Sequence, residues 1–158
     1  MKMLSAELST RKFWGCSMKR IFAICLALLL CGCSAETPDA ALSLSVSCAS
    51  VLEQGEAVPE SVRALVPNDG ILFSGQVEFA SGEDLLTVFL RAMREAKIPA
   101  VCDGAYVTSV GGVATGDCGP MSGWMFTVNG EYPTVGCDAV FPQDGDIVEW
   151  IYICEWNE

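Results

Sequence analysis

The chain has 158 residues, of which 20 are acidic, nine are basic and none is histidine, so its net charge at pH 7 is -11. Without histidine the chain cannot form a catalytic triad with a histidine base or a histidine-ligated zinc site. The excess of acidic residues also argues against nucleic acid as a partner, because phosphates attract clustered lysine and arginine.

The N-terminal region has the pattern of an export signal. Lys19 and Arg20 precede an apolar run over residues 21–30, and Cys31-Gly32-Cys33 follows directly. A basic start, about ten apolar residues and small residues before a cysteine are typical of bacterial lipoprotein signals. We predict cleavage before Cys33 and lipidation of its thiol. A transmembrane helix is a weaker alternative because such a helix needs ~20 apolar residues. A buried helix of the fold is also a weaker alternative, because it would carry Lys19 and Arg20 at one end and Gly32 at the other.

Removal of residues 1–32 changes the charge and the cysteine count. Four basic and 19 acidic residues remain, which gives a net charge of -15. We predict a tether over residues 33–41 and one domain over residues 42–158, outside the cytoplasm and anchored to the bacterial cell membrane by its lipid alone. Met18, followed by Lys-Arg, is predicted to be the true start. With Cys33 lipidated, five cysteines are disulfide candidates outside the cytoplasm: Cys48, Cys102, Cys118, Cys137 and Cys154.

The first half of the predicted domain contains strands and one helix. Residues 42–48 alternate between apolar residues and serine, which predicts a half-buried strand. Residues 53–70 are acidic and contain prolines, as expected of a loop with a short helix. A second strand is predicted from two pieces, 71–73 and 76–79. Residues 85–97 show helical spacing of apolar residues.

The predicted helix has start and stop signals. Ser81 is its expected N-cap, followed by the acidic residues Glu83 and Asp84, and Pro99 is expected to stop it. Basic residues near its C-terminal end complement the helix dipole.

The second half is strand-rich. We predict a strand over residues 105–110, a type I′ hairpin with strands 124–128 and 131–134 around Asn129-Gly130, and a last strand over 147–154. The last strand is apolar on both faces, which is typical of an interior strand. The order of elements predicts the α+β class, with a β-grasp-like mixed sheet packed on one helix.

Two segments resemble a known family. Residues 117–137 include Ser-Gly-Trp-Met-Phe-Thr-Val-Asn-Gly, and residues 144–154 begin with Asp-Gly-Asp. Over roughly residues 44–156 the chain resembles the transcobalamin-like C-terminal domain of bacterial surface proteins, which is similar to the C-terminal β-domain of transcobalamin and intrinsic factor. The resemblance implies cobalamin or a related corrinoid as a bound ligand; no resident cofactor follows from the residues. In the animal carriers this domain caps one side of the corrin ring, and a separate helical domain holds the rest.

An aromatic and thioether cluster lies beside the Asn-Gly turn. Trp124, Met125, Asn129 and Tyr132 are the predicted ligand contacts, because flat side chains with a polar group can stack on a planar ligand. The alternative is ordinary core packing. Trp124 and Phe126 lie two residues apart on one strand, and that spacing favours the core for these two.

Five aspartates raise the question of a metal or glycosidase site: Asp103, Asp117, Asp138, Asp144 and Asp146. Calcium requires six to eight converging oxygens, and Asp144 with Asp146 supplies only two before a strand begins. Most of these aspartates flank glycines, which is typical of turns. We predict no metal site and no catalytic residues.

The expected sheet suggests a disulfide pattern. A first strand ending at Cys48 and a last strand ending at Cys154 are adjacent and parallel in a β-grasp sheet, while Cys118 and Cys137 flank the predicted hairpin. We predict the pairs Cys48–Cys154 and Cys118–Cys137, with Cys102 free.

Together these patterns predict a non-enzymatic, lipid-anchored ligand-binding module, with a corrinoid as the ligand that the resemblance implies. The alternative is a cell-surface module that binds a protein or a glycan, without a cofactor, through the hairpin or an exposed sheet edge. An enzyme is the third possibility.

Overall fold

The computed structural model describes residues 37–154. The predicted signal region and Cys33, the predicted lipidation site, lie outside these residues. Within 37–154 no helix is long and apolar enough to span a membrane. The described elements, in chain order, are β1 (Ala40–Ser47), α2 (Ala49–Glu53), η1 (Gly55–Ala57), α3 (Glu60–Arg63), β2 (Ile71–Phe79), α4 (Leu85–Glu95), β3 (Ala100–Asp103), β4 (Tyr106–Val110), β5 (Val113–Ala114), β6 (Gly123–Val128), η2 (Cys137–Ala139) and β7 (Ile147–Ile153).

The main sheet has four strands in the order β2-β1-β7-β6, with β1 and β7 parallel and the other neighbours antiparallel. The predicted α+β class, with a mixed sheet packed on a helix, is confirmed. β7 is an interior strand, as its two apolar faces predict. Strand β1 begins at Ala40, so its first two residues lie within the predicted tether.

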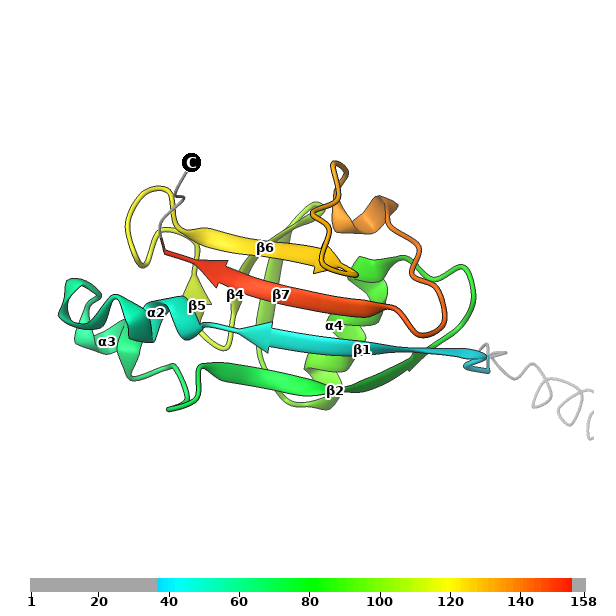
Figure 1. Ribbon diagram of the computed structural model, residues 1–158, viewed down its shortest axis with the longest axis horizontal. Helices are drawn as coiled ribbons and strands as arrows, with labels where there is room; N and C mark the ends of the chain where they lie inside the picture. Colours follow the sequence, from blue (N-terminus) through cyan, green and yellow to red (C-terminus); the bar gives the residue numbers. More distant parts are fainter. Residues whose placement is uncertain (1–36, 155–158) are drawn as a thin grey trace, which may run out of the picture. The chain divides into compact units, whose positions relative to one another are not determined.

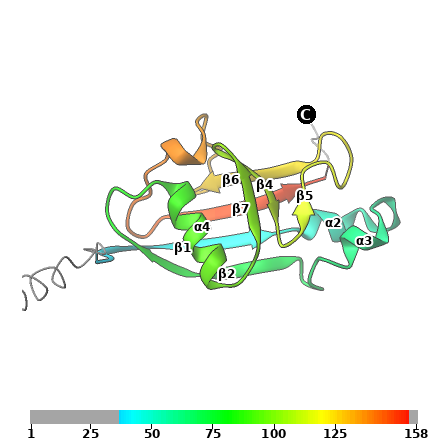
Figure 2. The same cartoon turned by 180° about the vertical axis from the view of Figure 1, so that it is seen from behind.

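The core lies between the main sheet and α4, which runs behind the sheet in Figure 1 and in front of it in Figure 2. Alternate residues of β7, namely Val148, Trp150 and Tyr152, are at most 1% exposed and face this core. The ring of Phe89 on α4 stacks on Trp150 with 4.0 Å between ring centroids. Burial of these large side chains stabilises the contact between helix and sheet.

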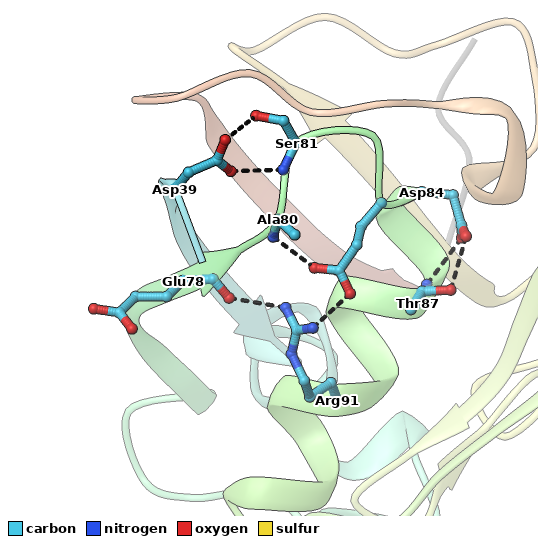
Figure 3. A network of polar contacts seen from close by, with 8 residues as sticks. Asp39, Glu78, Ala80, Ser81, Asp84, Thr87 and Arg91 are labelled. Carbon is cyan, nitrogen blue, oxygen red and sulfur yellow. Dashed lines mark hydrogen bonds and ion pairs between the residues drawn. The ribbon is translucent and has the colours of Figure 1, made fainter. Parts of the chain in front are cut away.

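The N-cap of α4 is Asp84 rather than the predicted Ser81. Asp84 Oδ1 accepts a hydrogen bond of 2.9 Å from Thr87 N, and the helix begins at Leu85. Ser81 has another partner, because its backbone N–H and its hydroxyl both donate to the carboxylate of Asp39, the residue directly before β1 (Figure 3). The same figure shows that the loop between β2 and α4 is joined to β1 through this pair.

Arg91 does not compensate the C-terminal helix dipole as the sequence suggests. Its guanidinium points back toward the start of the helix. There it donates to Glu83 Oε1 in the preceding loop at 2.6 Å and to the backbone oxygen of Glu78 near the end of β2 at 2.8 Å (Figure 3). The hydrogen bond from Arg91 lowers the pKa of the Glu83 carboxyl below its usual value. This contact joins α4 to the end of β2.

The predicted hairpin after β6 is wrong beyond its turn. Asn129 and Gly130 have φ values of 53° and 81°, as a type I′ turn requires, and Val128 forms a bridge with Glu131. The chain then leaves the sheet, and β6 pairs with β7 instead. Pro133 gives the physical reason, because it has no N–H to donate to a continued ladder.

A second, three-stranded sheet has the order β3-β4-β5. β4 was expected from the sequence, whereas the four residues of β3 directly after Pro99 were not. Between β1 and β2 the chain forms α2, η1 and α3, where a loop with one short helix was predicted. Trp124 joins the two sheets, because its indole N–H donates to Val113 O at 3.0 Å.

Candidate functional site

A pocket of about 340 Å³ lies at the open edge of β6. Its three walls are β6, the turn between β3 and β4, and the loop that follows the Asn129-Gly130 turn. The volume falls at the small end of the range for ligand pockets, so the pocket encloses a small molecule or one part of a larger one. Its lining residues are Asp103, Ala105, Tyr106, Val107, Trp124, Met125, Phe126, Pro133, Val135, Gly136, Cys137 and Trp150.

The bottom of the pocket is made of buried side chains. Trp124 and Trp150 are 2% and 1% exposed. Both tryptophans pack against other aromatic side chains. Trp124 packs edge-on against Tyr152, and Trp150 stacks with Phe89 and Phe126. These two tryptophans therefore offer a rigid apolar floor.

The sides of the pocket carry the accessible aromatic surface. Phe126 and Met125 on β6 are partly exposed, and Tyr106 on β4 is 42% exposed. Val135, at 52% exposure, stands on the opposite loop. Apolar side chains that remain in water around a pocket are available to a ligand or partner.

The polar groups of the pocket are few. Asp103 is its only carboxylate, and the lining contains no lysine or arginine. The thiol of Cys137 donates to Ala105 O at 2.9 Å, and burial raises its pKa to about 11. At neutral pH this thiol is therefore protonated and weakly nucleophilic.

A close backbone contact holds the loop against the β3–β4 turn. A Cβ atom placed on Gly136 would lie 2.6 Å from Ala105 Cβ, which is too close for two non-bonded carbon atoms. Glycine at position 136 therefore allows the loop to pack on the turn and close that end of the pocket.

The four predicted contact residues divide between the pocket and its surroundings. Trp124 and Met125 line the pocket, while Asn129 and Tyr132 are outside the lining. The side chain of Asn129 holds the turn, since its Nδ2 donates to Asp146 Oδ1 and its Oδ1 accepts from Ile147 N. Tyr132 is 51% exposed beside the pocket loop. Ligand contact by any of the four stays a prediction.

Sequence reasoning did not select Tyr106, Phe126, Val135 or Asp103 for the site. Phe126 alternates with Trp124 and was assigned to the core, which is partly correct because it stacks on Trp150 at 5.0 Å. Its position on an edge strand leaves it partly exposed as well. Tyr106 and Val135 are separated from β6 along the chain, and only the packing of the loop on the β3–β4 turn brings them together.

The predicted disulfides are wrong in their pairing. The structure joins Cys118 to Cys154, with Cα atoms 5.0 Å apart, and leaves Cys48, Cys102 and Cys137 free. The strand register explains why Cys48 misses Cys154. Ser47 lies opposite Ile151, so Cys48 is level with Tyr152, two residues before Cys154.

The expected partner of Cys118 also lies elsewhere. Gly123 pairs with Ile153, which brings the loop before β6 to the end of β7 and Cys118 to Cys154. Cys137 follows the opposite end of β6 and packs at Ala105. Because the predicted hairpin does not continue past Glu131, it has no base for the two cysteines to join.

The aspartates near the C-terminus hold turns together. Asp144 Oδ1 accepts a hydrogen bond from Ala41 N at 2.9 Å, and Asp146 Oδ2 accepts one from Gln143 N at 2.8 Å. Within residues 37–154 no three histidine, cysteine or acidic side chains form a group that could hold a metal ion.

Comparisons with known proteins give one family match and several similar solved structures. A family model described as "Domain of unknown function (DUF4430)" matches residues 82–153. A search of curated proteins finds no match. Haptocorrin in complex with Cbi is similar with a TM-score of 0.49 and 14% identity, over 74% of this chain and 26% of that one. The chain thus spans about a quarter of haptocorrin.

The second structure is a proposed metal-binding protein from Ruminococcus gnavus ATCC 29149. It is similar with a TM-score of 0.45 and 16% identity, over 75% of this chain and 100% of that one. At these identities no residue of this chain takes a role from either structure.

Proposed function

We propose that this chain is a non-enzymatic ligand-binding module whose ligand, a corrinoid such as cobalamin, binds at the β6 pocket. The observation that carries the proposal is the pocket itself: partly exposed Phe126, Met125 and Tyr106 stand around a floor of two buried tryptophans. A flat ligand with apolar faces suits such walls. The sequence resemblance to transcobalamin-like domains supports the corrinoid class.

The size of the pocket limits how such a ligand binds. A corrinoid is larger than about 340 Å³, so only one edge of the macrocycle enters, and the remainder lies over the exposed rim. The side chains at that rim, Val135 and Tyr106, then contact the ligand from two sides.

Isothermal calorimetry of residues 37–158 with cobalamin and with cobinamide tests the ligand. We expect saturable binding at concentrations on the order of tens of micromolar or below. Val135→Lys places a charged side chain at the rim, and we expect it to weaken binding about tenfold or more, because apolar contact is lost and a charge is desolvated. Ile147→Lys is the matched control. Ile147 is 54% exposed and lies outside the pocket lining, so its replacement leaves affinity unchanged.

If neither cobalamin nor cobinamide gave heat of binding, a corrinoid would be rejected as the ligand. Equal effects of the two lysine substitutions would reject the pocket as its site. The remaining alternative would then be a surface module that binds a protein or a glycan.

We also propose that the chain is exported and anchored to the bacterial cell membrane by lipid on Cys33. The support is the basic start, short apolar run and Gly-Cys sequence of the N-terminal region. In cell fractionation the unmodified chain is expected in the membrane fraction, and Cys33→Ala outside it. Cys31→Ala is the control and keeps the membrane location. A Cys33→Ala chain that stays with the membrane would overturn the anchor.

A further inference from the structure

The segment that covers the β6 pocket is weakly held. Residues 132–135, called the strap below, lie between the Asn129-Gly130 turn and η2, and Pro133 and Val135 of the strap line the pocket. Within residues 37–154, no backbone group of the strap takes part in a hydrogen bond with another backbone group. Three of its four residues are exposed, and Pro133 is partly buried. An exposed backbone with few buried contacts is typical of a segment that opens locally.

The two ends of the strap are held with different strength. Before the strap, Val128 and Glu131 exchange two backbone hydrogen bonds of 2.9 and 3.0 Å. After it, the thiol of Cys137 donates to Ala105 O, and a thiol is a weak donor. The second end therefore separates from its partner more easily than the first, and the strap opens by leaving the turn between β3 and β4.

A clasp of side-chain hydrogen bonds sets the direction in which the strap leaves the sheet. Asn129 Nδ2 donates to Asp146 Oδ1 at 2.8 Å, and Asn129 Oδ1 accepts from Ile147 N at 2.9 Å. Asp146 Oδ2 in turn accepts from Gln143 N at 2.8 Å. The clasp thus joins the turn before the strap to the turn before β7. Loss of these contacts would free the first end of the strap as well.

The floor of the pocket is covered while the strap is in place. Trp124, Trp150 and Cys137 line the pocket, yet they are only 2%, 1% and 1% exposed. A ligand in contact with these side chains must displace a part of the wall above them. The other walls belong to the paired strand β6 and to the turn that joins the paired strands β3 and β4. The strap is therefore the part of the wall that moves most easily.

We propose that the strap is a lid that opens to admit a ligand to the pocket floor, and that Asn129 and Asp146 are the positioning residues that hold it closed. This role of Asn129 requires no contact with the ligand. The inference rests on the proposed function only in treating the pocket as a ligand site, and it holds for any small apolar molecule that reaches the floor.

Alkylation by iodoacetamide measures the opening of the strap without any corrinoid. In residues 37–158 with Cys102→Ser and the disulfide intact, two thiols remain, Cys137 in the pocket and fully buried Cys48 in the core. Peptide mapping gives the rate at each thiol, relative to its rate in the chain unfolded by urea. Cys137 needs only the strap to open, whereas Cys48 needs the core to open. We therefore expect Cys137 to react at least about tenfold faster.

Exchange of the two clasp residues tests their role. Asn129→Asp removes a donor and places a second carboxylate against Asp146, while aspartate tolerates the positive φ of this turn. We expect Cys137 to react about tenfold faster and Cys48 to react as before. Adding Asp146→Asn reverses the donor and the acceptor, because the amide at position 146 donates to the carboxylate at position 129 and still accepts from Gln143 N. We expect this double variant to regain the original rate.

The matched control combines Asn129→Asp with Asp144→Asn. It has the same composition and net charge as the exchanged pair, and an asparagine at position 144 keeps the oxygen that accepts from Ala41 N. Its carboxylates at positions 129 and 146 still face each other. We therefore expect Cys137 to react as fast in this variant as in Asn129→Asp alone.

Two results would overturn the proposal. Equal relative rates at Cys137 and Cys48 would show that the pocket opens only with the core, and equal Cys137 rates in the two double variants would remove the clasp from the mechanism. A chain that binds cobalamin but shows equal relative rates would lose the lid and keep the proposed function. A chain with the expected rates that gives no heat with cobalamin or cobinamide would keep the lid and lose the corrinoid.

Discussion

Glu83 shows how one side chain can join several elements. Its carboxylate accepts from Arg91 on α4 and from the backbone N–H of Ala80, which follows β2. The side chains of Glu83 and Arg91 are 18% and 26% exposed, so the pair is partly shielded from water. Such a pair contributes more than a fully exposed one, whose contribution is about 0 to 1 kcal/mol.

The depressed pKa of Glu83 predicts a pH dependence of stability. Because the folded state holds the carboxylate ionised, this contribution is complete above the ordinary pKa of 4.5 and is lost as the pH falls through the lower folded value. Glu83→Gln should reduce the free energy of unfolding at pH 7 by about 1 kcal/mol. The difference from the unmodified protein should shrink below pH 4.5. Urea titrations between pH 2 and 7 measure both quantities.

Glu60→Gln is the control for this prediction. Glu60 pairs with Arg63 on α3, but its side chain is 81% exposed. We expect its replacement to change the free energy of unfolding by less than about 0.5 kcal/mol. If the difference in free energy of unfolding between Glu83→Gln and the unmodified protein were the same at pH 2 as at pH 7, the stabilising role of the Glu83 carboxylate would be contradicted.

At the scale of elements, the register of the sheet decides which cysteines meet. β1 and β7 are adjacent and parallel, as the sequence predicts, yet a displacement of two residues separates Cys48 from Cys154. Alternation of apolar residues reveals which face of a strand is buried, but it does not give the register between two strands. The prediction of the fold was therefore correct where the prediction of the disulfide was wrong.

The Cys118–Cys154 bond is expected to stabilise the end of β7. It closes a sequence separation of 36 residues, for which loss of the bond typically costs about 2 to 4 kcal/mol. Replacing both cysteines by serine should lower the midpoint of thermal unfolding, and a reductant should lower it in the unmodified protein only. Cys102→Ser is the control, because Cys102 is free and only partly buried. Mapping of peptides without reduction should recover Cys118 with Cys154; recovery of Cys102 in a stoichiometric bridge would contradict this connectivity.

At the scale of the whole molecule, charge and apolar surface are separated. The described basic residues belong to α3, to α4 and to the turn after α4, whereas the β6 pocket contains one carboxylate and no basic group. Partly exposed apolar side chains gather around that pocket. This separation supports the proposed ligand binding, since it leaves an apolar site with a single carboxylate in an acidic domain.

The sequence alone determined the class of fold and the main elements, which are the strands β1, β2, β4, β6 and β7 and the helix α4. Alternating residues in β1 and β7, the apolar stripe of α4 and the Asn129-Gly130 turn are local patterns, set by the geometry of each element and readable without its neighbours. The predicted export signal rests on an equally local pattern of residues, and it stays a prediction.

Only the tertiary structure decided the composition of the pocket and the disulfide. Tyr106, Phe126 and Val135 come from three segments, and they meet because Gly136 lets a loop pack on the β3–β4 turn. The hydrogen bond of Ser81 to Asp39 and the pairing of Cys118 with Cys154 likewise join residues distant in sequence. Contacts between segments depend on register and close packing, and a local pattern of residues contains neither.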